Sequence, residues 1–280
     1  MAVGCNFSSQ HVARETRNVT HVSKQQMSML TVVTRNGYIS VEQDDTVKDI
    51  TVTASVHASG KNMAEAQARL KKVKINITEA ESGDVSITTS WPSPDHTGDG
   101  VDFKIRVPAL KGFNGQTTNH RVTVTGADGP VTIKTSNDDV SMFGCKQTAT
   151  INTSNGDIQV KDHAGDVTIV TSNGDVDLSN LMGAASVETS NGLVTINLNE
   201  KSSAPVQATT SNDSINLTCG SGWNGVIKAQ TQNGLINLTG ADGRISNQAI
   251  SDSSGTLTVG SGGEASRLTT SNDGISITIK

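Results

Sequence analysis

The chain has 280 residues, a formal net charge of −5 and 34% hydrophobic residues, but only two Trp, one Tyr and four Phe. A large globular core normally uses more aromatic volume, so this composition favours a narrow core of aliphatic side chains. The 22 Lys and Arg form no basic stripe with interleaved aromatics, which argues against nucleic-acid binding, and no apolar run is long enough to span a membrane.

Residues 1–30 are polar and aperiodic, so they predict a flexible lead-in. The run Ala-Val-Gly-Cys that ends at Cys5 resembles the end of a bacterial lipoprotein signal, although no hydrophobic segment precedes it. Cys5 is therefore a candidate lipid anchor, and an incidental cysteine is the other interpretation. The protein is expected to be extracytoplasmic or at the cell surface if a signal has been removed, and cytoplasmic if Met1 is the native start.

Residues 31–112 are expected to cap the N-terminal end of a repeat structure. A first turn lies at Thr34, and alternating residues predict strands over 50–56, 73–77, 85–89 and 101–107. Asn62 and Glu65 have the spacing of a capping box, which predicts a short helix over residues 62–72. Such an atypical segment is what a repeat rod needs at its end.

Residues 113–280 repeat the phrase Thr-Ser-Asn-Gly-Asp-Val and its variants. The steps between successive anchors are 18, 18, 18, 18, 21, 21, 21 and 18 residues. The anchors are Thr117, Thr135, Thr153, Thr171, Thr189, Thr210, Thr231, Asp252 and Thr270. Residues alternate between apolar and polar on both sides of each anchor, which predicts two half-buried strands per coil. The expected fold is all-β: a right-handed parallel β-helix, or β-solenoid, of 18–21-residue coils with one short helix in the N-terminal capping region.

The second and third positions after each anchor predict a tight corner. The second position carries Asn, including Asn137, Asn155, Asn173 and Asn191, and these side chains are expected to stack into a hydrogen-bonded ladder. The third position carries Gly, Asp or His, including Gly156, Gly174 and Gly192. Because Gly and Asp tolerate positive φ well, a left-handed residue is predicted there.

The fourth position carries a carboxylate in three successive coils, at Asp139, Asp157 and Asp175. Stacking would place these groups ~5 Å apart, where like charges repel and a Ca²⁺ ion would relieve the repulsion. The alternative is a solvated acidic column that is screened by salt. Apart from this candidate Ca²⁺ column, no cofactor is expected.

Cys145 and Cys219 lie about four coils apart, roughly 19 Å at strand spacing. A disulfide tolerates at most ~7 Å between Cα atoms, so both cysteines are predicted to be unpaired.

Several of these features together resemble the bacterial putative-adhesin family, a β-solenoid domain of unknown function with Thr-Ser-Asn-Gly repeats. They are the early turn at Thr34–Gly37, the helix near residues 64–72, the strand ending in Val-Pro at Pro108, and the serial coils that follow. The resemblance covers roughly residues 30–280. It implies an exported or membrane-anchored protein and brings no catalytic motif with it.

The sequence thus favours a non-enzymatic, surface-associated solenoid that serves in adhesion or as a structural spacer, with a cell-surface glycan or protein as partner. The second hypothesis is a self-assembling scaffold that polymerises through an uncapped C-terminal coil, because only Lys280 follows the last repeat. A polysaccharide-active enzyme is the third. It would need convergent carboxylates in a cleft made by long loops, whereas the loops here are short and Trp91 and Trp223 are isolated.

Overall fold

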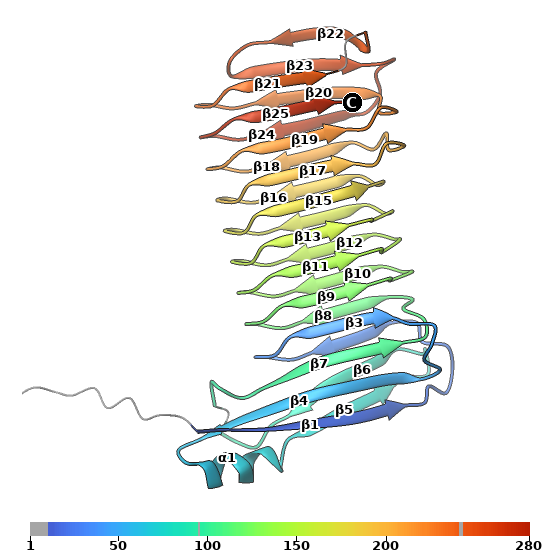
Figure 1. Cartoon of the computed structure of the whole chain (residues 1–280), viewed down its shortest axis with the longest axis vertical. Helices are drawn as coiled ribbons and strands as arrows, with labels where there is room; N and C mark the ends of the chain where they lie inside the picture. Colours follow the sequence, from blue (N-terminus) through green and yellow to red (C-terminus); the bar gives the residue numbers. More distant parts are fainter. Residues whose placement is uncertain (1–10, 95, 241–242) are drawn as a thin grey trace, which may run out of the picture.

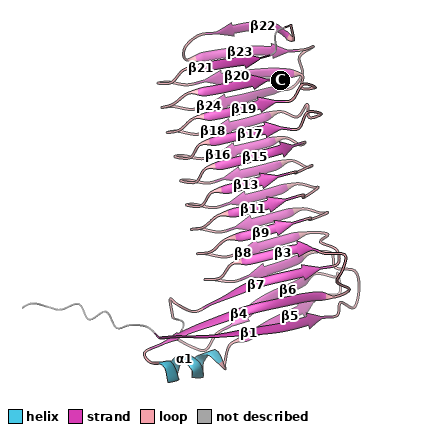
Figure 2. Cartoon of the chain, viewed as in Figure 1, coloured by secondary structure: helices cyan, strands magenta, loops and turns pink. Residues whose placement is uncertain are grey.

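The computed structural model describes residues 11–94, 96–240 and 243–280, and these form one elongated rod (Figure 1). The regular secondary structure of the described residues is β-strand except for one short helix, which lies at one end of the rod, and loops and turns join the strands (Figure 2). Within these ranges the strands form two sheets, one of 12 and one of 13 strands, that face each other across a continuous hydrophobic core. The expected all-β solenoid is confirmed.

The N-terminal part supplies one end of the rod. Its elements are β1 (His11–His21), β2 (Leu30–Val33), β3 (Ile39–Gln43), β4 (Ile50–Gly60), α1 (Met63–Leu70), β5 (Lys74–Glu79), β6 (Val85–Ser90) and β7 (Gly100–Val107). Strand β1 pairs antiparallel with β4 along its whole length, and β4 pairs antiparallel with β7. The prediction of a flexible lead-in was therefore wrong for residues 11–21, which form the edge strand of the 12-stranded sheet.

The helix is held at both ends by side chains. Asn62 accepts a hydrogen bond from the Glu65 backbone N–H at 2.8 Å, which is the N-cap bond of the predicted capping box. The Glu65 carboxylate reaches back to the Lys61 N–H at 2.9 Å, so the return bond lies one residue before the N-cap. At the other end, the Arg17 guanidinium of β1 donates to the carbonyl oxygens of Leu70 and Val73 at 2.8 and 2.6 Å. These contacts anchor α1 to the edge strand.

The middle of the rod is regular, and each coil contributes one strand to each sheet. The 12-stranded sheet contains β9 (Val122–Thr125), β11 (Val140–Phe143), β13 (Ile158–Lys161), β15 (Val176–Leu181), β17 (Val194–Leu198) and β19 (Ile215–Cys219). The 13-stranded sheet contains β8 (Phe113–Gln116), β10 (Val131–Lys134), β12 (Ala149–Asn152), β14 (Val167–Val170), β16 (Ala185–Glu188) and β18 (Val206–Thr209). Pairing is parallel and joins equivalent repeat positions, so inward residues such as Val140 and Ile158 stack in columns.

The last stretch of chain departs from sequential stacking. Its elements are β20 (Gly225–Gln230), β21 (Ile236–Gly240), β22 (Ile245–Ile250), β23 (Ser254–Val259), β24 (Ala265–Thr269) and β25 (Ile275–Ile279). Strand β24 lies between β18 and β20, and β25 lies between β19 and β21. The C-terminal coil is thus inserted between two coils that precede it in the sequence.

Two predictions about the C-terminal end were consequently wrong. Asp252 does not anchor a coil: β22 and β23, which flank it, form an antiparallel hairpin, and β23 runs antiparallel to β20. The final coil is also not an uncapped end, because both of its strands are hydrogen-bonded on both sides. The idea of a scaffold that polymerises through a bare last coil therefore loses its structural basis.

Trp223 fills the core where the inserted coil enters. It lies in the loop between β19 and β20 and is fully buried, and its indole Nε1 donates to the Ala204 carbonyl at 3.1 Å. The ring lies against Gly225, because a Cβ at that glycine would come within 2.6 Å of it. The additional residues of this 21-residue coil therefore carry a core side chain inward as well as lengthening a corner.

Candidate functional site

The predicted asparagines meet along one edge of the rod. Each side-chain amide donates to the Oδ1 atom of the asparagine in the preceding coil, at 2.9 Å for Asn155 to Asn137 and 2.7 Å for both Asn173 to Asn155 and Asn191 to Asn173. The complete ladder in spatial order is Asn36, Asn119, Asn137, Asn155, Asn173, Asn191, Asn212, Asn272 and Asn233. The ladder follows the order of coils in space, so Asn272 lies between Asn212 and Asn233.

The anchor threonines have a role that the sequence pattern did not reveal. Their side chains are buried, and several hydroxyls donate to the backbone carbonyl at the third corner position of the preceding coil. Examples are Thr117 to Gly37 at 2.9 Å and Thr270 to Asp213 at 2.8 Å. A hydroxyl on a short β-branched side chain suits this position because it satisfies a carbonyl inside the corner. The signal available in the sequence was the persistence of Thr itself.

The glycines at the third corner position are not left-handed, so that prediction was wrong: none of Gly156, Gly174 and Gly192 has positive φ. Glycine is required instead by close stacking. A Cβ at Gly174 would come within 1.9 Å of the Gly156 carbonyl oxygen, and Gly156 and Gly192 have the same restriction at 2.0 and 1.9 Å. The left-handed residues lie elsewhere, for example at Asp162 and Asn180.

The acidic column provides acceptors for backbone N–H groups. Asp139 Oδ1 accepts from the Asp157 N–H at 3.1 Å, Asp157 Oδ1 from the Asp175 N–H at 2.9 Å, and Asp175 Oδ1 from the Leu193 N–H at 2.8 Å. Each carboxylate thus satisfies the backbone of the next coil. Arg121 also donates to Asp139 Oδ2 at 3.2 Å, which offsets charge at the end of the column.

Where the third corner position is aspartate, the backbone N–H of the fourth position has a different acceptor. The side chains of Asp138, Asp213 and Asp273 each accept from the backbone N–H of the next residue, at 2.7–2.8 Å. Such a corner needs no acceptor from the preceding coil. This explains why the acidic column stops at Leu193, since the corner stacked above it is that of Asp213.

Removal of one carboxylate from the middle of the column should show this role. Asp157→Ala leaves the Asp175 N–H without its protein acceptor and is expected to lower the free energy of unfolding by about 1 kcal/mol. Asp157→Asn keeps an oxygen acceptor while removing the charge, so its effect should be much smaller. Urea denaturation of both variants measures the difference. Equal losses in the two variants would contradict the hydrogen-bonding role.

The described residues contain no group of three or more His, Cys, Asp and Glu side chains arranged to hold a metal ion. The candidate Ca²⁺ column at Asp139, Asp157 and Asp175 therefore stays a prediction from the sequence alone. Cys5, the candidate lipid anchor, lies outside the residues that the structure describes. Among the described residues, no helix is long and apolar enough to cross a membrane.

Cys145 and Cys219 are free and buried, as the spacing predicted. Burial raises the pKa of both thiols, that of Cys219 to about 12. Since the thiolate is the reactive form, neither cysteine should react appreciably with a maleimide in the native protein at pH 7.5. Both should react within minutes in denaturant. Rapid native labelling of either residue, located by peptide mass analysis, would contradict this packing.

The outer surface of the 12-stranded sheet carries an extended uncharged area, here called the neutral face. It spans β17, β19, β25 and β21 in spatial order. Two rows of side chains form it: Thr195, Asn216, Ser276 and Asn237, and beside them Asn197, Thr218, Thr278 and Thr239. None of the eight side chains is engaged in a hydrogen bond within the described part of the chain. The face is not evident from the sequence, because the insertion of β25 between β19 and β21 completes it.

The neutral face therefore presents about 14 Å of unengaged hydroxyl and amide groups on rigid strands. On β15 its lower boundary is charged, because Asp177 is the neighbour of Thr195. Such an array can bind a polyhydroxyl surface through many hydrogen bonds, and its eight side chains include no carboxylate, histidine, cysteine or lysine.

Comparisons with known proteins identify the family. The Toastrack DUF4097 family model matches residues 74–278. No curated relative matches the sequence. Among solved structures, the chain is similar to one described as a putative adhesin from Bacteroides fragilis, with 13% identity, a TM-score of 0.49, and coverage of 95% of this chain and 97% of that chain. It is also similar to one described as a putative lipid binding protein from Parabacteroides distasonis, with 14% identity, a TM-score of 0.46, and coverage of 95% and 96%. The family model covers most of the chain, so the protein belongs to the Toastrack DUF4097 family.

Proposed function

We propose that the protein is a non-enzymatic, adhesin-like binding module of the cell surface, and that its neutral face binds an uncharged glycan. The observation that carries the proposal is the pair of rows of unengaged Thr, Ser and Asn side chains across four stacked coils. Because β17, β19 and β25 are each hydrogen-bonded to strands on both sides and β21 is paired with β25, these groups are held in place before binding, which reduces its entropic cost.

The chemistry of the face suits a glycan better than an ion or an apolar partner. Its groups are donors and acceptors without net charge, and they match sugar hydroxyls without requiring desolvation of an ion. Large apolar side chains are absent from the two rows, so an apolar protein surface would gain little by docking there. An extracytoplasmic location accompanies this proposal, since the partner would be a surface polymer.

A glycan array with the fluorescently labelled protein tests the proposal. Ser276→Arg and Asn216→Arg place a bulky cation in the centre of the neutral face, and each should reduce binding to the recognised uncharged glycan at least tenfold. Thr150→Arg is the matched control, because Thr150 is exposed on the outer surface of the other sheet. Thermal melts should show that all three variants remain folded.

Three outcomes would contradict the proposed function. One is the absence of binding to any uncharged glycan on the array. Another is equal weakening by Thr150→Arg and the two face variants, which would indicate a general effect of added charge. The third is hydrolysis of a glycan that is bound, since the proposed module is not an enzyme.

A further inference from the structure

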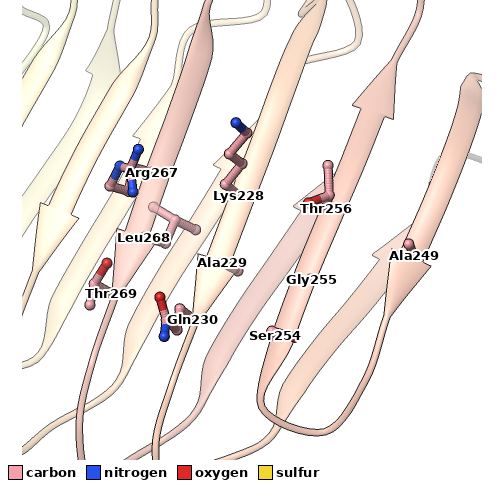
Figure 3. A pocket seen from close by; sticks show the side chains of 10 residues that line it. All are labelled: Lys228, Ala229, Gln230, Ala249, Ser254, Gly255, Thr256, Arg267, Leu268 and Thr269. Carbon is pink, nitrogen blue, oxygen red and sulfur yellow. The ribbon is translucent and has the colours of Figure 1, made fainter.

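A second surface feature lies on the opposite sheet, toward the end of the rod that is distant from α1. It is a hollow of about 370 Å³ on the outer surface of β24, β20, β23 and β22. We call it the basic hollow, and its polar lining consists of Lys228, Gln230, Ser254, Thr256, Arg267 and Thr269 (Figure 3). On β22 the cross-strand partner of Thr256 is Ala249, whose single methyl group leaves the hollow open on that side.

Two cations project side by side into this hollow. Lys228 of β20 and Arg267 of β24 are direct partners across the parallel pair, and both are exposed (Figure 3). Neither is engaged in an ion pair within the described ranges, and no carboxylate is among the lining residues. Like charges directly opposite each other on neighbouring strands repel, so a bound anion would stabilise this arrangement.

The groups around the two cations can also donate hydrogen bonds. Thr256 is the cross-strand partner of Lys228 on β23, and Gln207 is the partner of Arg267 on β18. The next row across the hollow carries Thr269, Gln230 and Ser254. Hydroxyl and amide groups next to a paired ammonium and guanidinium suit a ligand that combines an anionic group with hydroxyls.

The cation pair is confined to the hollow. The same row continues down the sheet as Ser186, Thr168, Thr150 and Thr132, and all four are uncharged. Lys228 and Arg267 are far apart in the sequence, and they meet only because β24 is inserted beside β20. The arrangement is therefore a local product of the fold and does not continue a charged stripe.

We propose that the basic hollow binds an anionic sugar unit, a uronate or a sulfated sugar, of an acidic polysaccharide. The guanidinium and ammonium groups hold the anionic group, and Thr256, Thr269 and Gln230 bind neighbouring hydroxyls. A lipid surface fits less well, because none of the large exposed hydrophobic side chains of the described residues lines the hollow. This site is independent of the neutral face, which lies on the other sheet.

Isothermal titration of the full chain with a galacturonic acid hexamer and with a sulfated heparin hexasaccharide tests this site. Binding of at least one of them is expected, weakening as salt increases. Lys228→Gln and Arg267→Gln should each reduce affinity at least fivefold, and the double variant at least twentyfold. Lys134→Gln is the matched control, since Lys134 is an exposed cation on the same sheet far from the hollow. Inorganic phosphate and phosphatidylglycerol vesicles are the comparison probes.

Several results would overturn the proposal. They are the absence of binding to both oligosaccharides, an equal loss of affinity in Lys134→Gln, and vesicle binding that depends on Lys228 and Arg267 without oligosaccharide binding. Binding of phosphate as tightly as of the oligosaccharides would also overturn it, because the sugar hydroxyls would then contribute nothing. The neutral face is unchanged in these variants, so uncharged-glycan binding reports separately on the proposed function.

Discussion

Trp223→Ala is expected to destabilise the protein by about 3–5 kcal/mol, the range for loss of a fully buried large aromatic side chain. The indole is the largest fully buried side chain in the described part of the chain, and its Nε1 satisfies the Ala204 carbonyl. Its removal leaves a cavity and an unpaired carbonyl where β24 enters between β18 and β20. Chemical denaturation followed by circular dichroism measures the loss.

Trp91→Ala is the matched control, because Trp91 is only partly buried at the N-terminal end of the rod. It should cost clearly less than Trp223→Ala. The single-tryptophan variants also separate the two fluorophores, and the emission of Trp223 should be the more blue-shifted. If the two substitutions have equal effects on stability, or if Trp223 emits as a solvated indole, the packing at the inserted coil is wrong.

Gly174→Val should lower the free energy of unfolding by about 3 kcal/mol, at the upper end of the cost of overpacking. The reason is overlap of the new Cβ with the Gly156 carbonyl, which would lie 1.9 Å away, since that atom belongs to the backbone and cannot turn aside. Gly174→Ala should be nearly as costly, because Ala introduces the same Cβ. Thermal and urea unfolding of both variants give the comparison.

Gly263→Val is the control for the general cost of replacing a glycine. A Cβ there would come no closer than 3.4 Å to any atom, so a small change is expected. The loss of unfolding free energy in Gly174→Asp should lie between those of Gly174→Val and Gly263→Val, because aspartate occupies the equivalent position in the coils of Asp138 and Asp213. A Gly174→Ala variant as stable as the wild type would show that close stacking does not explain the glycine.

The repeat chemistry was largely readable from the sequence. Apolar residues at fixed offsets from each anchor predicted the parallel coils, and the persistent Asn indicated the place where the ladder forms. The conformation at Gly174 was not predicted, because glycine is used both for positive φ and for close backbone approach, and the sequence does not distinguish these two uses. The partner of the Asp157 carboxylate was also not evident, since it is a backbone N–H in another coil.

The spatial order of the coils at the C-terminal end could not be predicted from the repeat pattern. Asp252 continues the numerical spacing between Thr231 and Thr270, although it lies in a hairpin turn. Two deviations marked the place: Gln248 occupies an apolar position, and Ser254 stands where the ladder has Asn. Neither deviation indicates that β24 lies between β18 and β20, because every coil carries the same inward aliphatic pattern. The neutral face and the basic hollow depend on that insertion, which explains why neither was predicted.

The inserted coil also bears on how the protein is made. A ribosome releases residues in order, so β18 leaves it well before β24, and at 5–20 residues per second the 55 intervening residues take roughly 3–11 s. During that interval one edge of β18 lacks its native neighbour, β24. Strand β20 is already available and has the same alternation of inward apolar residues, so it can form a non-native pair with β18. A nascent chain therefore needs either a delay in the docking of β20 or a partner that covers the open edge until residue 269 has emerged.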